Sequence, residues 1–317
     1  MTNNQHATRL TEIIRDISIN NLDKETIWES VEREFEKSGH FLSWGYISQK
    51  ARNDFLQKYI REDILDQGKT PCDTEALVDI YTYMYMLMHI DAFRVAKRMT
   101  DNYTFNDIYN DDHEEVLLVD FGCGPGTIPL AIAERYQPEN GLNINYLGID
   151  RESEMLRLSE EFFQTSLFTQ SLDISISDDI IRVDNGIEPK KIIFVFSYLL
   201  SQPRINVFLE SFISRIKDIM ADHPSVEDFY LMYINKDYTG ENYTENEEPK
   251  SAWYEFLDML RSNEMVSDSL SNFSKCSNYT FRKFNNLDGN DIDLFDYPRP
   301  VYVKLFRLYK SEVNTHG

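Results

Sequence analysis

Apolar side chains at helical spacing dominate the first hundred residues of the chain. They recur at intervals of three and four over residues 10–17, which predicts an amphipathic helix. Helices are also predicted over residues 23–39, where a capping aspartate and a glycine frame an apolar pattern, and over residues 44–65. Asp73 can cap a long helix over residues 74–99, because no Gly or Pro interrupts that segment.

The pattern changes near residue 102, where a polar and turn-rich segment begins. From Val116 onward, short apolar segments are separated by helical patterns, which is typical of a parallel sheet buried on both faces. We therefore expect an N-terminal all-helical domain (residues 1–112) followed by an α/β domain (residues 113–317). Strands are predicted over 116–119, 143–149, 172–176, 191–196 and 229–234, helices over 127–136, 152–163, 204–220 and 252–261, a closing antiparallel pair over 279–284 and 301–309, and a polar loop over 237–250.

Composition narrows the class of protein. The 317 residues carry 32 basic and 54 acidic side chains, a net charge of −22, which disfavours a general nucleic-acid binder. The apolar runs are too short to span a bilayer, and the polar N-terminus lacks the plan of a secretory signal. Three scattered cysteines indicate neither a disulfide framework nor a metal site, so a cytoplasmic protein is expected.

The most informative motif follows the first predicted strand. Residues 116–127 read VLLVDFGCGPGT, which places a glycine-rich turn between a buried strand and a helix. Glycine lets the backbone turn tightly and approach a ligand, and the helix N-terminus offers free N–H groups. This is the setting that a nucleotide-like cofactor requires.

The spacing and the acidic residues discriminate between cofactors. Glycines at every second position do not match the G-x-G-x-x-G of a dinucleotide site, and no Gly-Lys-Ser/Thr phosphate loop is present. Asp120, just before the turn, would repel a pyrophosphate but suits the cationic S-adenosylmethionine. Asp150 ends the next strand, where a carboxylate can accept both ribose hydroxyls. Met155, in the following helix, can lie against an adenine ring.

At these residues the sequence resembles the class I S-adenosylmethionine-dependent methyltransferases, in the segments DFGCGPGT and YLGID. The resemblance covers about residues 116–309 and implies a Rossmann-like sheet. It implies that the glycine turn and its acidic neighbour line the methionine part of the cofactor, that the segment after the second strand binds ribose and adenine, and that the residues after the fourth strand lie near the methyl group. The candidate cofactor-binding residues are Asp120, Gly122, Cys123, Gly124, Pro125, Gly126, Asp150, Arg151, Met155, Asp178 (or its neighbour Asp179) and Ser197, and the candidate catalytic residue is Tyr198.

Two further comparisons concern the acceptor. The segment after the fourth strand reads FSYLLSQP and departs from the N-P-P-Y or D-P-P-Y of enzymes that methylate amino groups of nucleic-acid bases. A tyrosine-rich helix, GCGPGT and SYLLS occur in the order found in the mitochondrial-type ribosomal small-subunit assembly methyltransferases. The cysteine cluster of that family is not matched by the three isolated cysteines here.

The helix over residues 74–99 carries side chains that could be structural or functional. Its apolar stripe is more often core or domain interface, although Tyr81, Tyr83 or Tyr85 could line a cavity over the methyl donor. His89 and Asp91 are two residues apart, so their side chains diverge on a helix. We interpret both as structural or surface residues.

Three functional hypotheses remain. The first is a methyltransferase that acts on a small-molecule or protein acceptor, which the acidic balance favours. The second is an RNA or ribosome-assembly methyltransferase, and the third is a non-catalytic cofactor-binding module that works through a protein partner. No general base can be named, and neither the oligomeric state nor the acceptor atom follows from the sequence.

Overall fold

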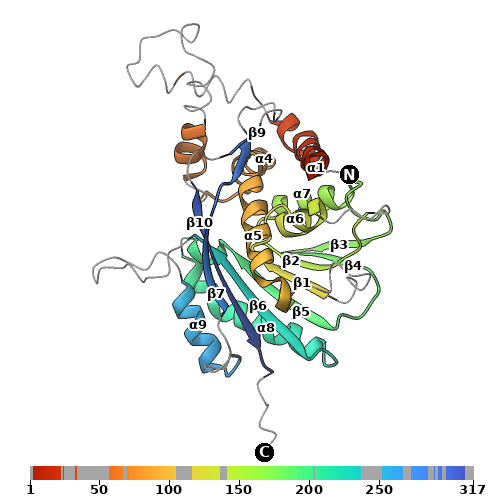
Figure 1. Ribbon diagram of the computed structural model, residues 1–317, viewed down its shortest axis with the longest axis vertical. Coiled ribbons are helices and arrows are strands. Elements are labelled where there is room, and N and C mark those ends of the chain that lie inside the picture. The colour runs from red at the N-terminus through yellow and green to blue at the C-terminus, as the bar shows by residue number, and fades with distance from the viewer. Residues whose placement is uncertain are drawn as a thin grey trace, which may run out of the picture.

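The structure is a computed structural model of the full chain (Figure 1). It describes residues 3–22, 24, 33, 57–66, 70–104, 116–135, 141–202, 204–236, 252–266, 273–284, 289, 292–294 and 298–310. The predicted helix over 23–39, most of the one over 44–65, and the predicted loop over 237–250 lie outside these residues, apart from single positions.

A mixed sheet of eight strands forms the centre of the molecule, in the order β3-β4-β2-β1-β5-β6-β10-β7. The four inner strands β2, β1, β5 and β6 are parallel, and the strands outside them run antiparallel to their neighbours. The predicted α/β, Rossmann-like fold is therefore confirmed. The strands are β1 (Val116–Phe121), β2 (Asn145–Ile149), β3 (Asp173–Ser177), β4 (Ile180–Asp184), β5 (Lys191–Ser197), β6 (Asp228–Asn235), β7 (Phe273–Tyr279) and β10 (Arg299–Leu308).

Helices cover both faces of this sheet (Figure 1). One face packs against α6 and α7 together with the N-terminal helices, and the other packs against α8 and α9. The N-terminal helices thus share one hydrophobic cluster with the sheet, and the division of the chain at residue 112 stays a prediction. The helices are α1 (Asn3–Ile17), α4 (Glu75–Tyr81), α5 (Leu87–Thr104), α6 (Thr127–Arg135), α7 (Ser153–Phe163), α8 (Leu209–Asp222) and α9 (Trp253–Ser262), with short 3-10 turns at η1 (Ile19–Asn21), η8 (Leu199–Ser201) and η9 (Ile205–Phe208).

The long helix predicted after Asp73 is present, but it is not a uniform α-helix. Its capping residue is Thr74, whose hydroxyl accepts a hydrogen bond from the backbone N–H of Leu77 at 3.4 Å. Between α4 and α5 lies a wider π-helical segment, η5 (Thr82–Met86). Such segments often occur at functional sites, and Tyr81 precedes this one directly. A second π-helical segment is η3 (Ile60–Ile64).

Two strand predictions need correction. The third predicted strand is β3, but it forms a hairpin with β4, which the sequence analysis missed, and β4 pairs antiparallel with β2. The closing antiparallel partner of β10 is β7, not residues 279–284. Residues Arg282–Phe284 form β8, which pairs with β9 (Ile292–Leu294) in a separate two-stranded sheet. Alternation alone does not distinguish a strand that closes the main sheet from one that forms a small ribbon beside it.

Candidate functional site

A cavity of about 530 Å³ lies at the carboxyl ends of the central strands. Strand β1 has β2 on one side and β5 on the other, so chain connections diverge in opposite directions at this point. Open α/β sheets bind ligands at such switch points. The cavity is lined by the turn after β1, the segment after β2, the segment after β5, the wall of α8, and side chains from the long N-terminal helix and the residues before it.

The glycine turn after β1 opens its backbone to the cavity. Gly124 has φ +54°, and a Cβ added there would meet no atom within 4 Å, so the backbone faces open space. Gly126 has φ +71° and faces Ser159 of α7 instead, whose hydroxyl would lie 3.1 Å from an added Cβ. The Ser159 hydroxyl donates to the Gly124 carbonyl at 3.0 Å. One glycine therefore exposes backbone to a ligand, and the other lets α7 approach.

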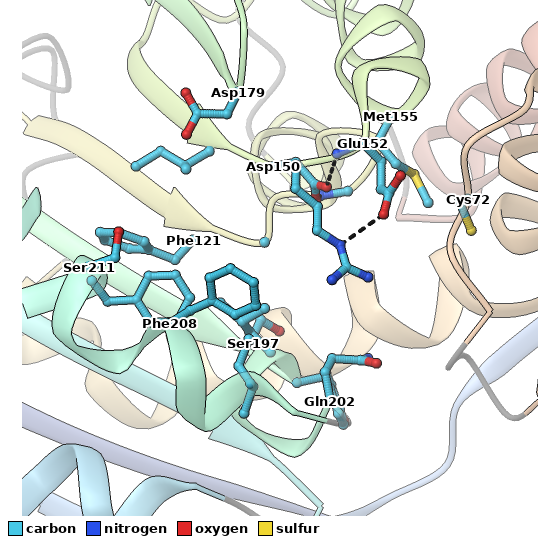
Figure 2. A pocket seen from close by; sticks show the side chains of 18 of the residues that line it. Cys72, Phe121, Asp150, Glu152, Met155, Asp179, Ser197, Gln202, Phe208 and Ser211 are labelled. Atoms are coloured by element: carbon cyan, nitrogen blue, oxygen red, sulfur yellow. Dashed lines mark hydrogen bonds and ion pairs between the residues drawn. The ribbon is translucent and has the colours of Figure 1, made fainter.

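Asp150 lines the cavity, and backbone donors hold both oxygens of its carboxylate (Figure 2). Its two oxygens accept hydrogen bonds from the backbone N–H of Gly124 at 2.9 Å and of Glu152 at 3.0 Å. Burial raises the pKa of Asp150, and these two hydrogen bonds oppose the rise because they stabilise the charged form. A carboxylate held by two backbone donors still has lone pairs for hydroxyl donors of a ligand.

Asp120 does not line the cavity. Its side chain is 2% exposed, and the Tyr146 hydroxyl donates to it at 3.0 Å. Burial raises the pKa of Asp120 to about 8, against the opposing hydrogen bond from Tyr146. The carboxyl group thus lies beneath the glycine turn, because alternate residues of β1 point to opposite faces of the sheet and Asp120 points away from the α8 side.

The hairpin between β3 and β4 brings one acidic side chain to the cavity. Asp179 lines it, whereas Asp178, the residue chosen from the sequence, does not. Asp178 occupies the tight turn with φ +40°, and the Asp179 carbonyl accepts from the backbone N–H of Asp150 at 2.9 Å. The unrecognised hairpin explains the difference of one residue.

An apolar wall on the α8 side was missed by the sequence analysis. Phe208 and Phe212 line the cavity together with Phe121 and Ile149. Figure 2 shows Phe121 and Phe208 on the side of the cavity opposite Met155. The helix over 204–220 was predicted, but which of its faces meets a cavity depends on how α8 packs. No local signal could have shown this.

Tyr198, at the end of β5, has a strained backbone and a stacked ring. Its φ is +59°, unusual for a bulky side chain, and its backbone N–H donates to the Ile234 carbonyl at 2.8 Å. Its ring stacks on His89 of α5, with centroids 4.7 Å apart and planes 13° apart. Burial raises the pKa of Tyr198 well above its usual value, and burial lowers the pKa of His89 to about 3. Both rings are therefore neutral at physiological pH.

The remaining side chains of the long helix divide between two roles. Tyr81 lines the cavity, whereas Tyr83 faces the other way and stacks on Phe284 at 6.1 Å. Asp91 is fully buried and accepts from the guanidinium of Arg282 at 2.7 Å, which agrees with a structural role and excludes a surface one. His89 and Asp91 do diverge, since one stacks on Tyr198 and the other pairs with Arg282.

The predicted cofactor residues thus fall into two groups. Those that line the cavity are Gly122, Gly124, Asp150, Arg151, Met155 and Ser197, and the candidate catalytic residue Tyr198 lines it as well. Those that do not are Asp120, Cys123, Pro125, Gly126 and Asp178. Burial raises the pKa of the Cys123 thiol well above its usual value, which makes it unreactive. Within the described residues, no cluster of His, Cys, Asp and Glu could hold a metal ion, and no helix is long and apolar enough to cross a membrane.

Fold and site together define a Rossmann-like α/β protein with a cavity at the switch point of its sheet. No family model and no curated protein matches the sequence. Similar solved structures include magnesium protoporphyrin IX methyltransferase from Synechocystis PCC 6803 with bound S-adenosylmethionine (10% identity, covering 82% of this chain and 98% of that one, TM-score 0.32). They also include an S-adenosylmethionine-dependent methyltransferase from Aquifex aeolicus (12%, 70% and 98%, TM-score 0.31) and a candidate RNA methyltransferase from Pyrococcus horikoshii (9%, 68% and 84%, TM-score 0.34).

Proposed function

We propose that the chain is an S-adenosylmethionine-dependent methyltransferase that acts on a small-molecule or protein acceptor. The observation that carries this proposal is Asp150. Its carboxylate is held by the backbone of the glycine turn on one side and of the α7 N-terminus on the other, at the edge of a cavity of suitable size. A ribose whose two hydroxyls donate to this carboxylate would lie across the ends of β1 and β2.

The rest of the cavity supports the same cofactor. The aromatic wall of Phe208 and Phe212 offers apolar surface for an adenine ring, and the Asp179 carboxylate lies where it could accept from an exocyclic amine. Gly124 leaves room for the methionine part beside the turn, whereas Gly122 packs closely against the Leu199 side chain. The role first assigned to Asp120, contact with a cationic group of the cofactor, stays a prediction. Its carboxyl lies beneath the turn and does not line the cavity.

Catalysis would come mainly from positioning. When bound, S-adenosylmethionine supplies a methyl group whose C–S bond breaks as a nucleophile of the acceptor attacks, with the electron pair passing to sulfur. Tyr81 and Tyr198 form the adjoining wall, where they would exclude water and orient the acceptor. The net charge of −22 favours a small molecule or protein over RNA as the acceptor.

The test is a thermal shift of the purified full chain with S-adenosylmethionine, S-adenosylhomocysteine and NAD. A ligand at 100 times its dissociation constant stabilises the folded state by about 2.7 kcal/mol. We expect a shift with the first two ligands and none with NAD. No shift with either sulfur ligand at millimolar concentration refutes the cofactor. Transfer of a labelled methyl group into a fractionated lysate separates an active enzyme from a binding module.

A further inference from the structure

The two sides of the cavity differ in charge. Asp150 and Asp179, the carboxylates assigned to the cofactor, line it from β2 and from the β3–β4 hairpin. Among the described residues, the N-terminal layer and the turn after β5 contribute only uncharged side chains to the cavity, including Tyr81, Tyr198 and Gln202. Figure 2 shows Gln202 at the side of the cavity away from Asp179. A neutral region is therefore left over once the cofactor groups are assigned.

His89 of α5 holds two cavity-lining tyrosines in one corner of this region. The ring of Tyr198 lies flat on the imidazole, with centroids 4.7 Å apart, and the ring of Tyr81 meets the same imidazole edge-on at 6.1 Å and 64°. Both tyrosines line the cavity, whereas His89 does not. The imidazole is thus the shared support that brings the two phenol rings together, although they come from helical layer and sheet.

Gln202 joins the same corner through the short helix η8. Tyr198 precedes η8 and Gln202 follows it, and the Ser201 hydroxyl closes the turn by donating to the Tyr198 carbonyl at 2.8 Å. The turn packs directly on the glycine loop, since a Cβ added to Gly122 would lie 2.8 Å from the side chain of Leu199. The corner therefore adjoins the part of the cavity where the methionine part of the cofactor is proposed to lie.

Two departures from regular backbone occur at this corner. Tyr198 is held at φ +59° by the hydrogen bond from its backbone N–H to the Ile234 carbonyl, and Tyr81 immediately precedes the π-helical segment η5. Left-handed backbone at a bulky residue is costly, and both this conformation and π-helical segments concentrate at functional sites. That both adjoin residues lining one cavity indicates that the position of these two side chains matters.

The corner offers hydrogen-bond donors that the protein itself does not use. Within the part of the chain that the structure describes, neither the Tyr81 and Tyr198 hydroxyls nor the side-chain amide of Gln202 forms a hydrogen bond. A hydroxyl and an amide NH₂ can each donate to an oxygen of a ligand. Few convergent polar groups in an aromatic wall are what fix the orientation of a small molecule.

We propose that Tyr81, Tyr198 and Gln202, which we name the acceptor corner, bind the hydroxyl oxygen of a planar phenol or enol, which is methylated there as its anion. This inference rests on the proposed function and names the substrate class of the same site. Donors directed at the oxygen stabilise its ionised form and align it with the methyl group. A protonated amine would meet the same donors and find no carboxylate beside them.

The step balances without a general base. The acceptor loses its proton to solvent before transfer, because the donors of the corner lower its pKa. The oxygen then forms a bond to the methyl carbon while the C–S bond breaks and its electron pair passes to sulfur. An oxyanion and a sulfonium become a neutral ether and a neutral thioether, so no proton moves during transfer.

The test uses 4-nitrophenol, whose acid and anion absorb at different wavelengths, and 4-nitroaniline, which has an amine in place of the hydroxyl. Each is titrated into the full chain saturated with S-adenosylhomocysteine, by absorbance at several pH values. We expect the phenolate to bind about tenfold or more tightly than the aniline, and the pKa of the bound phenol to fall by about one unit or more. With S-adenosylmethionine instead, the absorbance of the anion should disappear as 4-nitroanisole forms.

Variants with matched controls locate the effect. Tyr198→Phe and Gln202→Leu should each weaken phenolate binding about tenfold and return the pKa of the probe toward its value in water, because each removes a donor. Tyr83→Phe and Gln164→Leu, whose side chains do not line the cavity, should behave like the wild type.

Other titratable groups stay constant in this comparison. Those around Tyr81, His89 and Tyr198 are Cys72, Tyr85, Asp150, Tyr233, Lys236 and Arg299. All of them remain in the variants, so a difference from the wild type reports the removed hydroxyl or amide.

Three results would overturn the acceptor class. They are a phenolate that fails to bind at millimolar concentration to a chain that binds S-adenosylhomocysteine, an aniline that binds as tightly, and variants that match the wild type. If Tyr198→Phe does not fold by circular dichroism, Tyr81→Phe provides the same test. Failure to bind S-adenosylhomocysteine refutes the proposed function and this inference with it, whereas failure of the probe alone refutes only the acceptor class.

Discussion

The carboxylate of Asp150 and the backbone N–H of Gly124 lie 2.9 Å apart in a hydrogen bond that joins the ends of two parallel strands. The bond spans 26 residues of sequence and couples the glycine turn to the segment that would hold a ribose. The same carboxylate therefore both orders the turn and faces the cavity. Its two roles can be separated, because the first needs one oxygen and the second needs the remaining acceptor capacity.

Asp150→Asn should keep much of the turn and lose most of the cofactor affinity. The amide oxygen can still accept from one backbone donor, but the NH₂ group replaces an acceptor with a donor. We expect the dissociation constant for S-adenosylhomocysteine to rise about 10- to 100-fold, the effect of losing a hydrogen bond to a charged group. Calorimetry measures this, with Asp173→Asn on the exposed edge strand as control. Wild-type affinity in Asp150→Asn contradicts the ribose assignment.

Adjacent aspartates in the β3–β4 hairpin provide a matched pair. Asp179 lines the cavity and Asp178 does not. Asp179→Asn should raise the dissociation constant for S-adenosylhomocysteine about tenfold if its carboxylate accepts from the adenine amine, whereas Asp178→Asn should leave it unchanged. Fluorescence or calorimetric titration of both variants measures these two dissociation constants. A larger effect at Asp178 would restore the residue first chosen from the sequence.

Tyr198→Phe should reduce methyl transfer without weakening the cofactor. The phenyl ring keeps the stack on His89 but lacks the hydroxyl of this cavity-lining residue. We expect labelled-methyl incorporation into the lysate fraction to fall about tenfold or more, while the dissociation constant for S-adenosylhomocysteine stays within about twofold. Tyr83→Phe, which alters a ring stacked on Phe284 away from the cavity, is the control. Equal activity in both variants would leave Tyr198 a structural residue.

Arg282 holds two buried carboxylates, Asp91 and Glu134, at 2.7 and 2.5 Å. Arg282→Met leaves both carboxylates without this partner, which should lower the free energy of unfolding by about 3–5 kcal/mol. Urea denaturation of this variant and of the wild type measures the difference in the free energy of unfolding. Arg307→Met removes an arginine from an exposed pair with Asp228 and should cost about 1 kcal/mol or less. Similar losses in the two variants would contradict the burial of the cluster.

Asp120 should make stability fall as the pH rises. In the folded chain its carboxyl stays protonated up to a pKa of about 8, whereas in the unfolded chain it ionises near 4. Between these values the unfolded state has lost a proton that the folded state keeps, so raising the pH favours unfolding. Asp79, whose pKa is raised to about 7 by burial and by Glu75, acts in the same direction.

Asp120→Asn should therefore reduce the fall of the free energy of unfolding with rising pH. Its free energy of unfolding, relative to the wild type, should increase from pH 4 to pH 8, measured by urea denaturation at several pH values. The contribution from Asp79 remains in both proteins. A difference that is constant with pH would show that Asp120 is already ionised in the folded chain.

Local sequence was sufficient to predict the parts of the site that follow from strand order. The glycine turn and Asp150 each come directly after a buried strand, and parallel strands bring their carboxyl ends to one edge. This placed Gly122, Gly124 and Asp150 at one cavity without knowledge of any side-chain contact. The long helix after Thr74 could also be predicted from the sequence, because its length and lack of Gly and Pro are local properties.

Residues whose roles depend on distant packing could not be assigned in this way. In the two-residue turn of the hairpin, Asp179 and not Asp178 lines the cavity, and the pleat of β1 buries Asp120 beneath the loop. The stack of His89 on Tyr198 joins residues 109 positions apart in the sequence (198 − 89). The α/β order and the ligand-facing ends of the central strands could be predicted from the sequence, because these follow from periodicity and chain direction. Which side chains share the cavity depends on the tertiary structure, because those contacts form between elements whose relative packing has no local signal.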